Sequence, residues 1–455
     1  MNLSFPTEDT IAAIASAVSA GQGGIAVIRI SGEQAVEVAQ SIVHIPGKHM
    51  WESHNILYGH VIDKQNNELI DEVLVLPMKA PRSFTGEDVV EIHCHGGLIS
   101  VQRVLEQVLL SPKVRRASPG EFSERAVLNG RLELTQAEAI SDLIGARSEK
   151  AARIAMTGVS GRINKCIKAL REKLIDQLSE LEARVDFEDD LPPLNQANLL
   201  TQINDVQEQL QALIDDTKKS SIIRNGLKVG IIGLPNVGKS SLLNRLSKTE
   251  RAIVTDLPGT TRDLLEMEII IEGVPITLID TAGIHQTINK VEKLGVERSR
   301  EVLLTADIIL FIFDISKNWS DANQKLFNDI PPDIPKILIG NKSDIQISSK
   351  HITPDVIFSA LTGDGEENLI KALLQTSGAS DLNGSEITLN ERQLDLAMSA
   401  KISLDKTKQM ANENLPWDFW TIDLREAIHK LGELSGDEIT ESILDRIFSK
   451  FCIGK

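Results

Sequence analysis

A glycine-rich loop lies between an apolar segment and an expected helix near the middle of the chain. The apolar segment is 227–232, and the loop reads Gly233-Leu-Pro-Asn-Val-Gly-Lys-Ser240. This spacing fits G-x-x-x-x-G-K-[S/T], in which the glycines let backbone N–H groups close around phosphate groups. The lysine reaches the terminal phosphate oxygens, and the serine hydroxyl ligates magnesium. A strand, a phosphate loop and a helix in this order predict an α/β domain with a largely parallel sheet.

A second motif indicates which base the nucleotide carries. Asn341-Lys-Ser-Asp344 follows the apolar segment 337–340. The carboxylate of Asp344 can accept both the ring N–H and the exocyclic amine of guanine, and adenine offers neither in that geometry. Because a buried acceptor without a partner is heavily penalised, the motif favours GTP over ATP. Ser359-Ala360, after the expected strand 356–358, is expected to contact the guanine oxygen.

A third motif, Asp280-Thr-Ala-Gly283, ends another apolar segment. It would place Asp280 near magnesium and Gly283 beside the γ-phosphate. Together the motifs predict a GTP-hydrolysing domain over 221–377. The next residue is Ile284, whose side chain cannot orient water as the glutamine of Ras-type GTPases does, so that role must lie elsewhere.

The flanks of this domain have different patterns. Residues 1–118 are expected to be mixed α/β, with helices at 11–17 and 101–110 and strands at 25–30, 72–76 and 89–93. Apolar residues recur every three or four positions in segments on both sides of the GTP-hydrolysing domain, which is typical of packed helices. The two parts, 119–220 and 378–455, therefore predict one helical domain that the GTP-hydrolysing domain interrupts. The segments concerned are 167–185, 199–213, 390–413 and 418–450.

Charge and composition limit the partners and the compartment. The formal net charge is −17, with 65 acidic against 48 basic residues. Proteins that hold nucleic acid mainly through phosphate contacts normally carry a basic excess, so binding to RNA would need a local basic patch or a more basic partner. No apolar run approaches the roughly 20 residues that span a bilayer. The first ten residues lack the basic start of a signal peptide, and we expect a cytoplasmic protein without membrane contact.

The motifs taken together resemble a known family. GLPNVGKSSLLN, VTDLPGTTRD, DTAGI and NKSD are similar to the Era-like GTPases. Four flanking stretches narrow the resemblance to the tRNA-modification branch of the TrmE-Era-like GTPase family, and the resemblance covers essentially all 455 residues. These stretches are GGIAVIRISG, SFTGEDVVEIHCHGG, SPGEFSERAVLNGRLELTQAEAISDLI and the terminal FCIGK.

The resemblance implies an architecture and an activity. It implies an α+β folate-binding, dimer-forming domain at 1–118, a helical bundle domain from 119–220 and 378–455, and an inserted Ras-like P-loop G domain at 221–377. Family members form homodimers and join an FAD-containing MnmG-like partner in a heterotetramer or larger complex. They add a carboxymethylaminomethyl or aminomethyl group to C5 of the wobble uridine of certain tRNAs. The implied cofactors are GTP, Mg²⁺, K⁺ and 5-formyltetrahydrofolate or a related tetrahydrofolate, with FAD and NADH on the partner.

The resemblance also assigns roles to residues. Potassium would supply the charge of an arginine finger, and Glu292 would orient the attacking water; with Lys239 it is the catalytic candidate. Magnesium would be held by Ser240 and Thr261. Potassium would be held by Asn236, Thr255, Leu257 and Thr260, and folate by Arg29, Glu91, Arg131 and Lys455. The expected nucleotide-binding residues are Asn236, Val237, Gly238, Lys239, Ser240, Ser241, Thr255, Thr260, Thr261, Asp280, Thr281, Ala282, Gly283, Asn341, Lys342, Asp344, Ser359 and Ala360.

Other readings of some residues stay open at this point. Glu91, His93 and His95 alternate along one expected strand, but no further cluster completes four zinc ligands, so a folate pocket wall or plain packing is favoured. Cys452 is either a free thiol or a group near the folate. His285 stands where relatives often carry arginine. It is therefore open whether this chain makes the switch-region contact that such an arginine would make. A ribosome-assembly GTPase of the Era kind would need a basic RNA-binding domain after the G domain, and 378–455 shows no basic cluster.

Overall fold

The computed structural model describes residues 9–19, 21, 23–47, 49–186, 195–248, 265–280, 305–345, 352–379, 387–413, 415–438 and 440–454. The chain forms two compact units. The first contains Met1–Ser141, Val159–Ile203 and Ser399–Lys455, and the second contains Asp142–Gly158 and Asn204–Met398.

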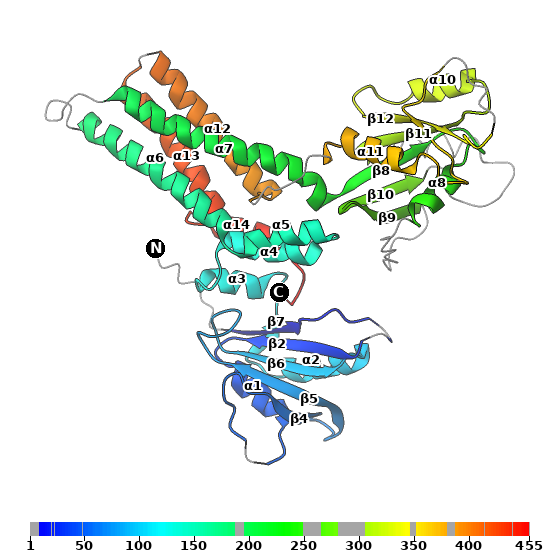
Figure 1. Ribbon diagram of the computed structural model, residues 1–455. Helices are drawn as coiled ribbons and strands as arrows, with labels where there is room; N and C mark the ends of the chain where they lie inside the picture. The colour runs from blue at the N-terminus through cyan, green and yellow to red at the C-terminus, as the bar shows by residue number, and fades with distance from the viewer. Residues whose placement is uncertain are drawn as a thin grey trace. The chain divides into compact units, whose positions relative to one another are not determined.

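The first unit contains a seven-stranded sheet with the strand order β3-β4-β5-β6-β2-β1-β7 (Figure 1). Helices α1 (Ala35–Ile42) and α2 (Leu98–Leu109) pack on the same face of this sheet, because the buried side chains of both join one apolar cluster with β2 and β6. The strands are β1 (Thr10–Ile14), β2 (Ile25–Ser31), β3 (Val43–His44), β4 (Leu57–Ile62), β5 (Leu69–Met78), β6 (Val89–His95) and β7 (Val114–Arg116).

The expected helix at 11–17 is wrong. That segment begins with β1, which pairs antiparallel with β2 and parallel with β7. Ile11, Ala12 and Ala13 are all at most 3% exposed, because β1 is covered on both faces of the sheet. A strand buried on both faces shows no alternation of polar and apolar residues, so its sequence cannot be told from that of a buried helix. The expected strands at 25–30, 72–76 and 89–93 and the helix at 101–110 are confirmed.

The opposite face of the sheet carries helix α3 (Glu121–Leu128), whose Phe122 packs against Ile11 and Ala13 of β1. Its Arg125 is only 3% exposed, and the guanidinium donates to the carboxylates of Asp9, Glu87 and Glu121. Arg115 at the end of the sheet donates to Glu121 as well. This network of charges, which is buried at Arg125 and Glu121, joins α3 to the sheet.

Helices from both ends of the chain pack together in the first unit. Helix α6 (Arg162–Asp186) lies beside α13 (Trp417–Ser435) in Figure 1, and the Arg171 guanidinium donates to the carbonyl of Ile428 and the carboxylate of Glu438. The prediction that segments before and after the G domain pack against each other is confirmed for this pair. The other helices of this part are α4 (Leu134–Gly145) and α14 (Glu441–Phe448).

The second unit contains a six-stranded sheet with the order β13-β12-β11-β8-β10-β9, parallel except for β9. Helices α8 (Lys239–Leu246) and α11 (Glu366–Thr376) share one apolar cluster with the sheet, and α10 (Asp321–Asn328) packs on the other face. The expected α/β domain with a largely parallel sheet is confirmed. The strands are β8 (Leu227–Ile232), β9 (Leu265–Ile271), β10 (Val274–Asp280), β11 (Ile308–Asp314), β12 (Lys336–Asn341) and β13 (Val356–Ile357).

Three further helices are α5 (Glu149–Val159), α7 (Gln196–Asn225) and α12 (Glu391–Asn412). The hydroxyl of Thr217 on α7 accepts from the backbone N–H of Leu389, just before α12, and Arg224 donates to the Leu389 carbonyl. The segments that enter and leave the G domain are therefore held together. Within the described ranges, no helix is both long and apolar enough to span a membrane.

Candidate nucleotide-binding site

The phosphate loop lies between β8 and α8, at the carboxyl edge of the parallel strands (Figure 1). Both of its glycines are needed. A Cβ on Gly233 would collide with the backbone oxygen of Ile312, and a Cβ on Gly238, where φ is +103°, would collide with the Asn341 amide. The loop therefore keeps an open backbone cradle at the N-terminus of an eight-residue helix, which suits phosphate.

The lysine of the loop lies folded over this cradle. Lys239 is 9% exposed, and its Nζ donates to the carbonyl oxygens of Gly233 at 2.6 Å and Leu234 at 2.9 Å. These two carbonyls occupy hydrogen bonds of the ammonium that phosphate oxygens would accept when a nucleotide is bound. The hydroxyl-bearing residues Ser240 and Ser241 are exposed in the first turn of α8, as groups that contact a ligand must be.

Asn341, the last residue of β12, joins three segments of the site. Its Nδ2 donates to the carbonyl of Val237 at 2.7 Å, and its Oδ1 accepts from the backbone N–H of Ala360 at 2.9 Å. The residue is 1% exposed, so both hydrogen bonds are shielded from water. This single side chain holds the phosphate loop and the Ser359-Ala360 segment after β13 to the end of β12.

The carboxylate expected to recognise guanine lies at the surface beside this junction. Asp344 is exposed, and its Oδ1 accepts a 2.6 Å hydrogen bond from the fully buried Ser359 hydroxyl. That bond orients the carboxylate without covering it. The arrangement fits the edge of a guanine ring, which presents two adjacent N–H donors to a carboxylate.

The third motif is described only at its first residue. Asp280 ends β10, and its backbone pairs with Ile231 of β8, next to the phosphate loop. The backbone of Asp280 therefore lies at the same edge of the sheet as the phosphate loop. The remaining candidates lie outside the described residues, so their assignments stay predictions: Thr255, Leu257, Thr260, Thr261, Thr281, Ala282, Gly283, His285, Glu292 and Lys455.

A second group of candidates meets on the N-terminal sheet. Arg29 on β2 donates from Nη2 to Glu91 on β6 at 2.8 Å, and its guanidinium lies 5.0 Å and 5.7 Å from the ring centroids of Phe84 and Phe122. The carboxylate of Glu91 is 15% exposed. The two expected folate residues therefore form a half-buried ion pair between aromatic rings.

The end of the chain comes to the same sheet. The carbonyl of Cys452 accepts from the backbone N–H of Gly120 at 3.3 Å, and a Cβ on Gly454 would collide with the backbone of Ile14. Gly454 therefore lies against β1, the neighbour of the strand that carries Arg29. Arg131 is exposed on the loop after α3.

Comparison with known proteins gives the family. A sequence model described as "MnmE helical domain" matches residues 134–452, and one described as "GTP-binding protein TrmE N-terminus" matches residues 10–131. The chain is 62% identical over 455 residues to a "tRNA modification GTPase MnmE" from Prochlorococcus marinus, with 100% of each chain covered. It is 59% identical over 453 residues to the protein of the same description from Synechococcus sp. (strain CC9311), with 98% of each covered.

The chain belongs to the MnmE family of tRNA modification GTPases. The protein is thus a GTP hydrolase with the three parts that the fold shows: a TrmE-type N-terminal domain, a helical domain and a P-loop G domain. Among solved structures, the chain is similar to a variant of Era from Aquifex aeolicus bound to GDP.AlF4-, with 30% identity, a TM-score of 0.27, and coverage of 39% of this chain and 66% of that one.

In this MnmE family member, the alternating residues on β6 do not converge on one site: His93 Nε2 lies 3.4 Å from Glu91 Oε2, and His95 has a different partner. Glu91 pairs with Arg29, and the His95 ring donates to Asp71, which raises the pKa of His95 through that hydrogen bond and the carboxylate charge. Burial raises the pKa of the intervening Cys94 thiol to about 11. In the part of the chain that the structure describes, no group of three or more acidic, His or Cys side chains could hold a metal ion.

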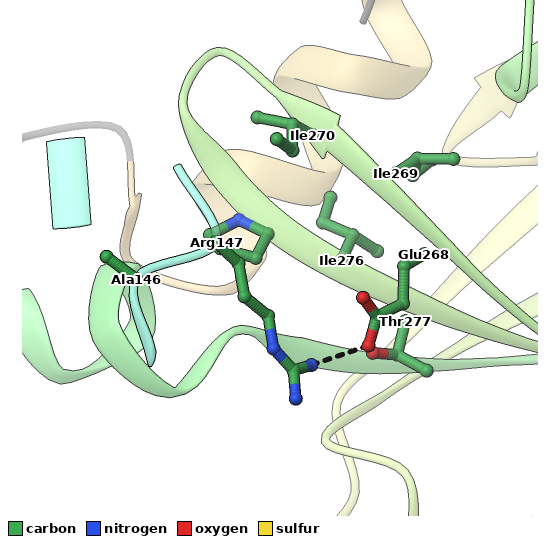
Figure 2. A pocket seen from close by; sticks show the side chains of 8 residues that line it. Ala146, Arg147, Glu268, Ile269, Ile270, Ile276 and Thr277 are labelled. Atoms are coloured by element: carbon green, nitrogen blue, oxygen red, sulfur yellow. Dashed lines mark hydrogen bonds and ion pairs between the residues drawn. The ribbon is translucent and has the colours of Figure 1, made fainter. Parts of the chain in front are cut away.

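A cavity of about 220 Å³ lies in the second unit, away from the phosphate loop. It is lined by Ala146 and Arg147, between α4 and α5, and by residues of the β9–β10 hairpin. Figure 2 shows Arg147 reaching across it to Glu268, with Nη1 and Oε1 2.6 Å apart. The hairpin that ends at Asp280 of the third motif thus contacts the helical segment 142–158.

Sequence reasoning missed one acidic residue of the site. Asp314 ends β11, and its Oδ2 accepts from Nζ of Lys342 at 2.8 Å. The available signal was its place at the end of a buried apolar strand, at the sheet edge where ligands of such folds bind.

Proposed function

We propose that this protein is a potassium-activated GTPase that, with an FAD-containing MnmG-like partner, adds a carboxymethylaminomethyl or aminomethyl group to C5 of the wobble uridine of certain tRNAs. The observation that carries the proposal is the full-length similarity to tRNA modification GTPases, at 62% identity. The tight contact between the phosphate loop and the guanine motif through Asn341 supports the GTP-dependent part.

Lys239 and Ser240 would hold the phosphates during hydrolysis. The Lys239 ammonium, now bound by the carbonyls of Gly233 and Leu234, would turn to the β- and γ-phosphate oxygens. Ser240, Thr261 and Asp280 would hold magnesium, which neutralises developing negative charge when it is bound. Glu292 would orient the attacking water, because Ile284 cannot.

Asn236 is our candidate for the potassium site. It is exposed on the phosphate loop with φ of +64°, a left-handed conformation that asparagine tolerates better than most residues. Thr255, Leu257 and Thr260 would complete the shell. Bound potassium would supply positive charge in place of an arginine finger.

We further propose that the N-terminal domain binds a tetrahydrofolate. The partly exposed Phe84 ring beside Arg29 offers an apolar wall for a flat ring, and Glu91 could accept hydrogen bonds from pterin N–H groups. Lys455 is the next residue after Gly454, which lies against β1, and it would bind the same ligand. Arg131, on the exposed loop, would bind a carboxylate of the ligand.

The same domain carries an apolar surface that supports a homodimer. Tyr58 on β4 and Leu74 on β5 are directly opposite each other in the sheet and are 49% and 44% exposed. A homodimer contact through this face of the sheet would cover these two side chains. The net charge of −17 indicates that much of the tRNA contact comes from the FAD-containing partner.

Hydrolysis would be coupled to the helical part through the β9–β10 hairpin. This hairpin lies in the chain between the segment that holds Thr255–Thr261 and the Asp280 motif, and it touches the helical segment 142–158 through Arg147 and Glu268. Rearrangement on either side of the hairpin would therefore move a strand that the helical segment contacts.

The test is GTP hydrolysis in potassium and in sodium at equal ionic strength. We expect hydrolysis in potassium to be faster by on the order of 10-fold or more, because without bound potassium the charge that replaces an arginine finger is lost. Asn236→Ala should lower the potassium rate to the sodium rate. Asn244→Ala, on the exposed side of α8, is the matched control and should behave as the wild type. Equal rates in both salts would contradict the proposal.

A further inference from the structure

The end of strand β11 carries a buried carboxylate with a defined set of donors. The Oδ1 of Asp314 accepts from the backbone N–H of Ser316 at 3.1 Å and from its hydroxyl at 2.6 Å. The Oδ2 accepts from Nζ of Lys342 at 2.8 Å, and the Nζ of the exposed Lys317 lies farther away, at 3.9 Å. The Asp314 side chain is 7% exposed, so this charge is held almost entirely by its protein partners.

The lysine that Asp314 binds has a second contact, with the phosphate loop. The Nζ of Lys342 also donates to the carbonyl oxygen of Asn236, at 3.0 Å. Lys342 is the second residue of the guanine motif, just after β12, and β11 lies between β12 and β8 in the sheet (Figure 1). One ammonium thus connects the end of β11 with the loop between β8 and α8.

We propose that Asp314 is a positioning residue for the nucleotide site, which fixes the Lys342 ammonium and, through it, the Asn236 carbonyl of the phosphate loop. A carboxylate is suited to this role because a charge-assisted hydrogen bond is shorter and about twice as strong as a neutral one. Burial by itself would raise the pKa of Asp314, but the Lys342 and Ser316 hydrogen bonds outweigh burial and hold it below its ordinary value of 3.8. The group is therefore ionised at neutral pH.

The neighbouring contacts define how large the effect should be. Asn341 independently ties the phosphate loop to the guanine motif through the Val237 carbonyl, so the site keeps one connection when Asp314 is lost. Removal of Asp314 should therefore loosen the hold on the nucleotide without abolishing binding. Asp314 does not reach the reacting atoms, and the Asn341 connection still holds the loop that carries the Asn236 side chain, so the hydrolysis step at saturating GTP should change less than nucleotide release.

The experiment measures release of a fluorescent GDP analogue from the full-length protein with Asp314→Asn, Asp314→Ala, Lys342→Ala and the double variant Asp314→Ala/Lys342→Ala. Asp314→Ala should release GDP roughly tenfold faster than the wild type, which is the effect of losing one partner of a buried charged hydrogen bond. Asp314→Asn keeps the shape and loses the charge, so its release rate should fall between those of the wild type and Asp314→Ala. KM for GTP should rise while kcat stays within about twofold of the wild type, since uniform binding is lost.

The double variant separates positioning from a general loss of structure. If Asp314 acts through Lys342, Asp314→Ala should add nothing to the release rate of Lys342→Ala. Asp307→Asn is the matched control, because Asp307 accepts from the Lys228 backbone at the opposite end of the same strand, at 2.8 Å, and should leave GDP release unchanged. Additive effects in the double variant, or wild-type release from both Asp314 variants, would overturn the proposal. Asp314→Asn decides the question if the alanine variant does not fold.

Discussion

Asn341 and Asp344 have different tasks although they belong to one four-residue motif. The Asn341 amide is 1% exposed and holds the phosphate loop and the Ala360 backbone together. Asp344 is exposed and is oriented by Ser359 alone among the hydrogen bonds described for its carboxylate. The first residue therefore builds the site, and the second is the residue that we propose meets the base.

This division predicts a change of specificity. Asp344→Asn should weaken binding of GTP by on the order of 100-fold and favour xanthosine triphosphate, because the amide reverses the donor and acceptor pattern that faces the base. The measurement is competition of the two nucleotides for the variant. Asp364→Asn, a nearby acidic residue that accepts from Thr362, should bind GTP as the wild type does. Unchanged GTP affinity in Asp344→Asn would count against the assignment.

Single residues of the site could be predicted from sequence where a motif has a fixed local spacing. Gly233, Gly238 and Lys239 lie within one short stretch of chain, so the strand–loop–helix pattern indicates their role. Asp314 could not be found in this way, because its partner Lys342 is 28 residues away and only the sheet order brings the two together. The Arg29–Glu91 pair spans 62 residues and was proposed from resemblance alone.

At the scale of elements, the sequence pattern predicted the helices with one apolar face and the apolar strands of the G domain, and it failed for the buried segment 11–17. The apolar residues that recur over 167–185 and 199–213 lie within α6 and α7. The pattern was readable because each of these helices buries one apolar face. Residues 11–17 gave the wrong prediction because β1 has neighbours on both edges and packing on both faces. Its strand conformation comes from pairing with β2 and β7, and β7 is distant in sequence.

The contact between α3 and the N-terminal sheet should depend on pH. Burial by itself would raise the pKa of Glu121, but hydrogen bonds from Arg115, the Ser118 backbone and Arg125 outweigh it and hold that pKa below the ordinary value of 4.5. The unfolded chain therefore takes up this proton at a higher pH than the folded chain does. The stabilisation is complete above about pH 4.5 and is lost as the pH falls through the lower, folded pKa.

Thermal unfolding of the full-length protein at several pH values, from neutral to well below the ordinary glutamate pKa, measures this effect. Glu121→Gln should lower the free energy of unfolding at neutral pH by about 3 kcal/mol, because it leaves the Arg125 charge with one buried partner fewer. In acid the difference between the variant and the wild type should shrink, since the wild-type carboxyl then takes up a proton as well. Asp333→Asn, a control in the other compact unit, should give no pH-dependent difference. A constant difference at all pH values would contradict the explanation.

At the scale of the whole molecule, the candidate sites lie on two parts of the chain, and a third part is helical. The G domain holds the nucleotide motifs, the N-terminal sheet holds the Arg29–Glu91 pair, and helices from both flanks of the G domain complete the chain. This order followed from the sequence because each part has its own residue pattern, and the family models match the N-terminal and helical parts. The proposed coupling of GTP hydrolysis to tRNA modification requires that hydrolysis change the arrangement of these parts.

The most direct test of that coupling is the yield of modified wobble uridine in a reconstituted reaction. Substrate tRNA is incubated with the FAD-containing partner, NADH, a tetrahydrofolate, glycine or ammonium, GTP and potassium, and its nucleosides are analysed by mass spectrometry. The wild-type protein should give the C5-modified uridine. Glu292→Ala should bind GTP, lose hydrolysis by on the order of 10²–10⁴ as expected for a positioned group, and give no more product than a reaction without GTP. Full modification by Glu292→Ala would show that hydrolysis is not coupled to the chemistry and would contradict the account.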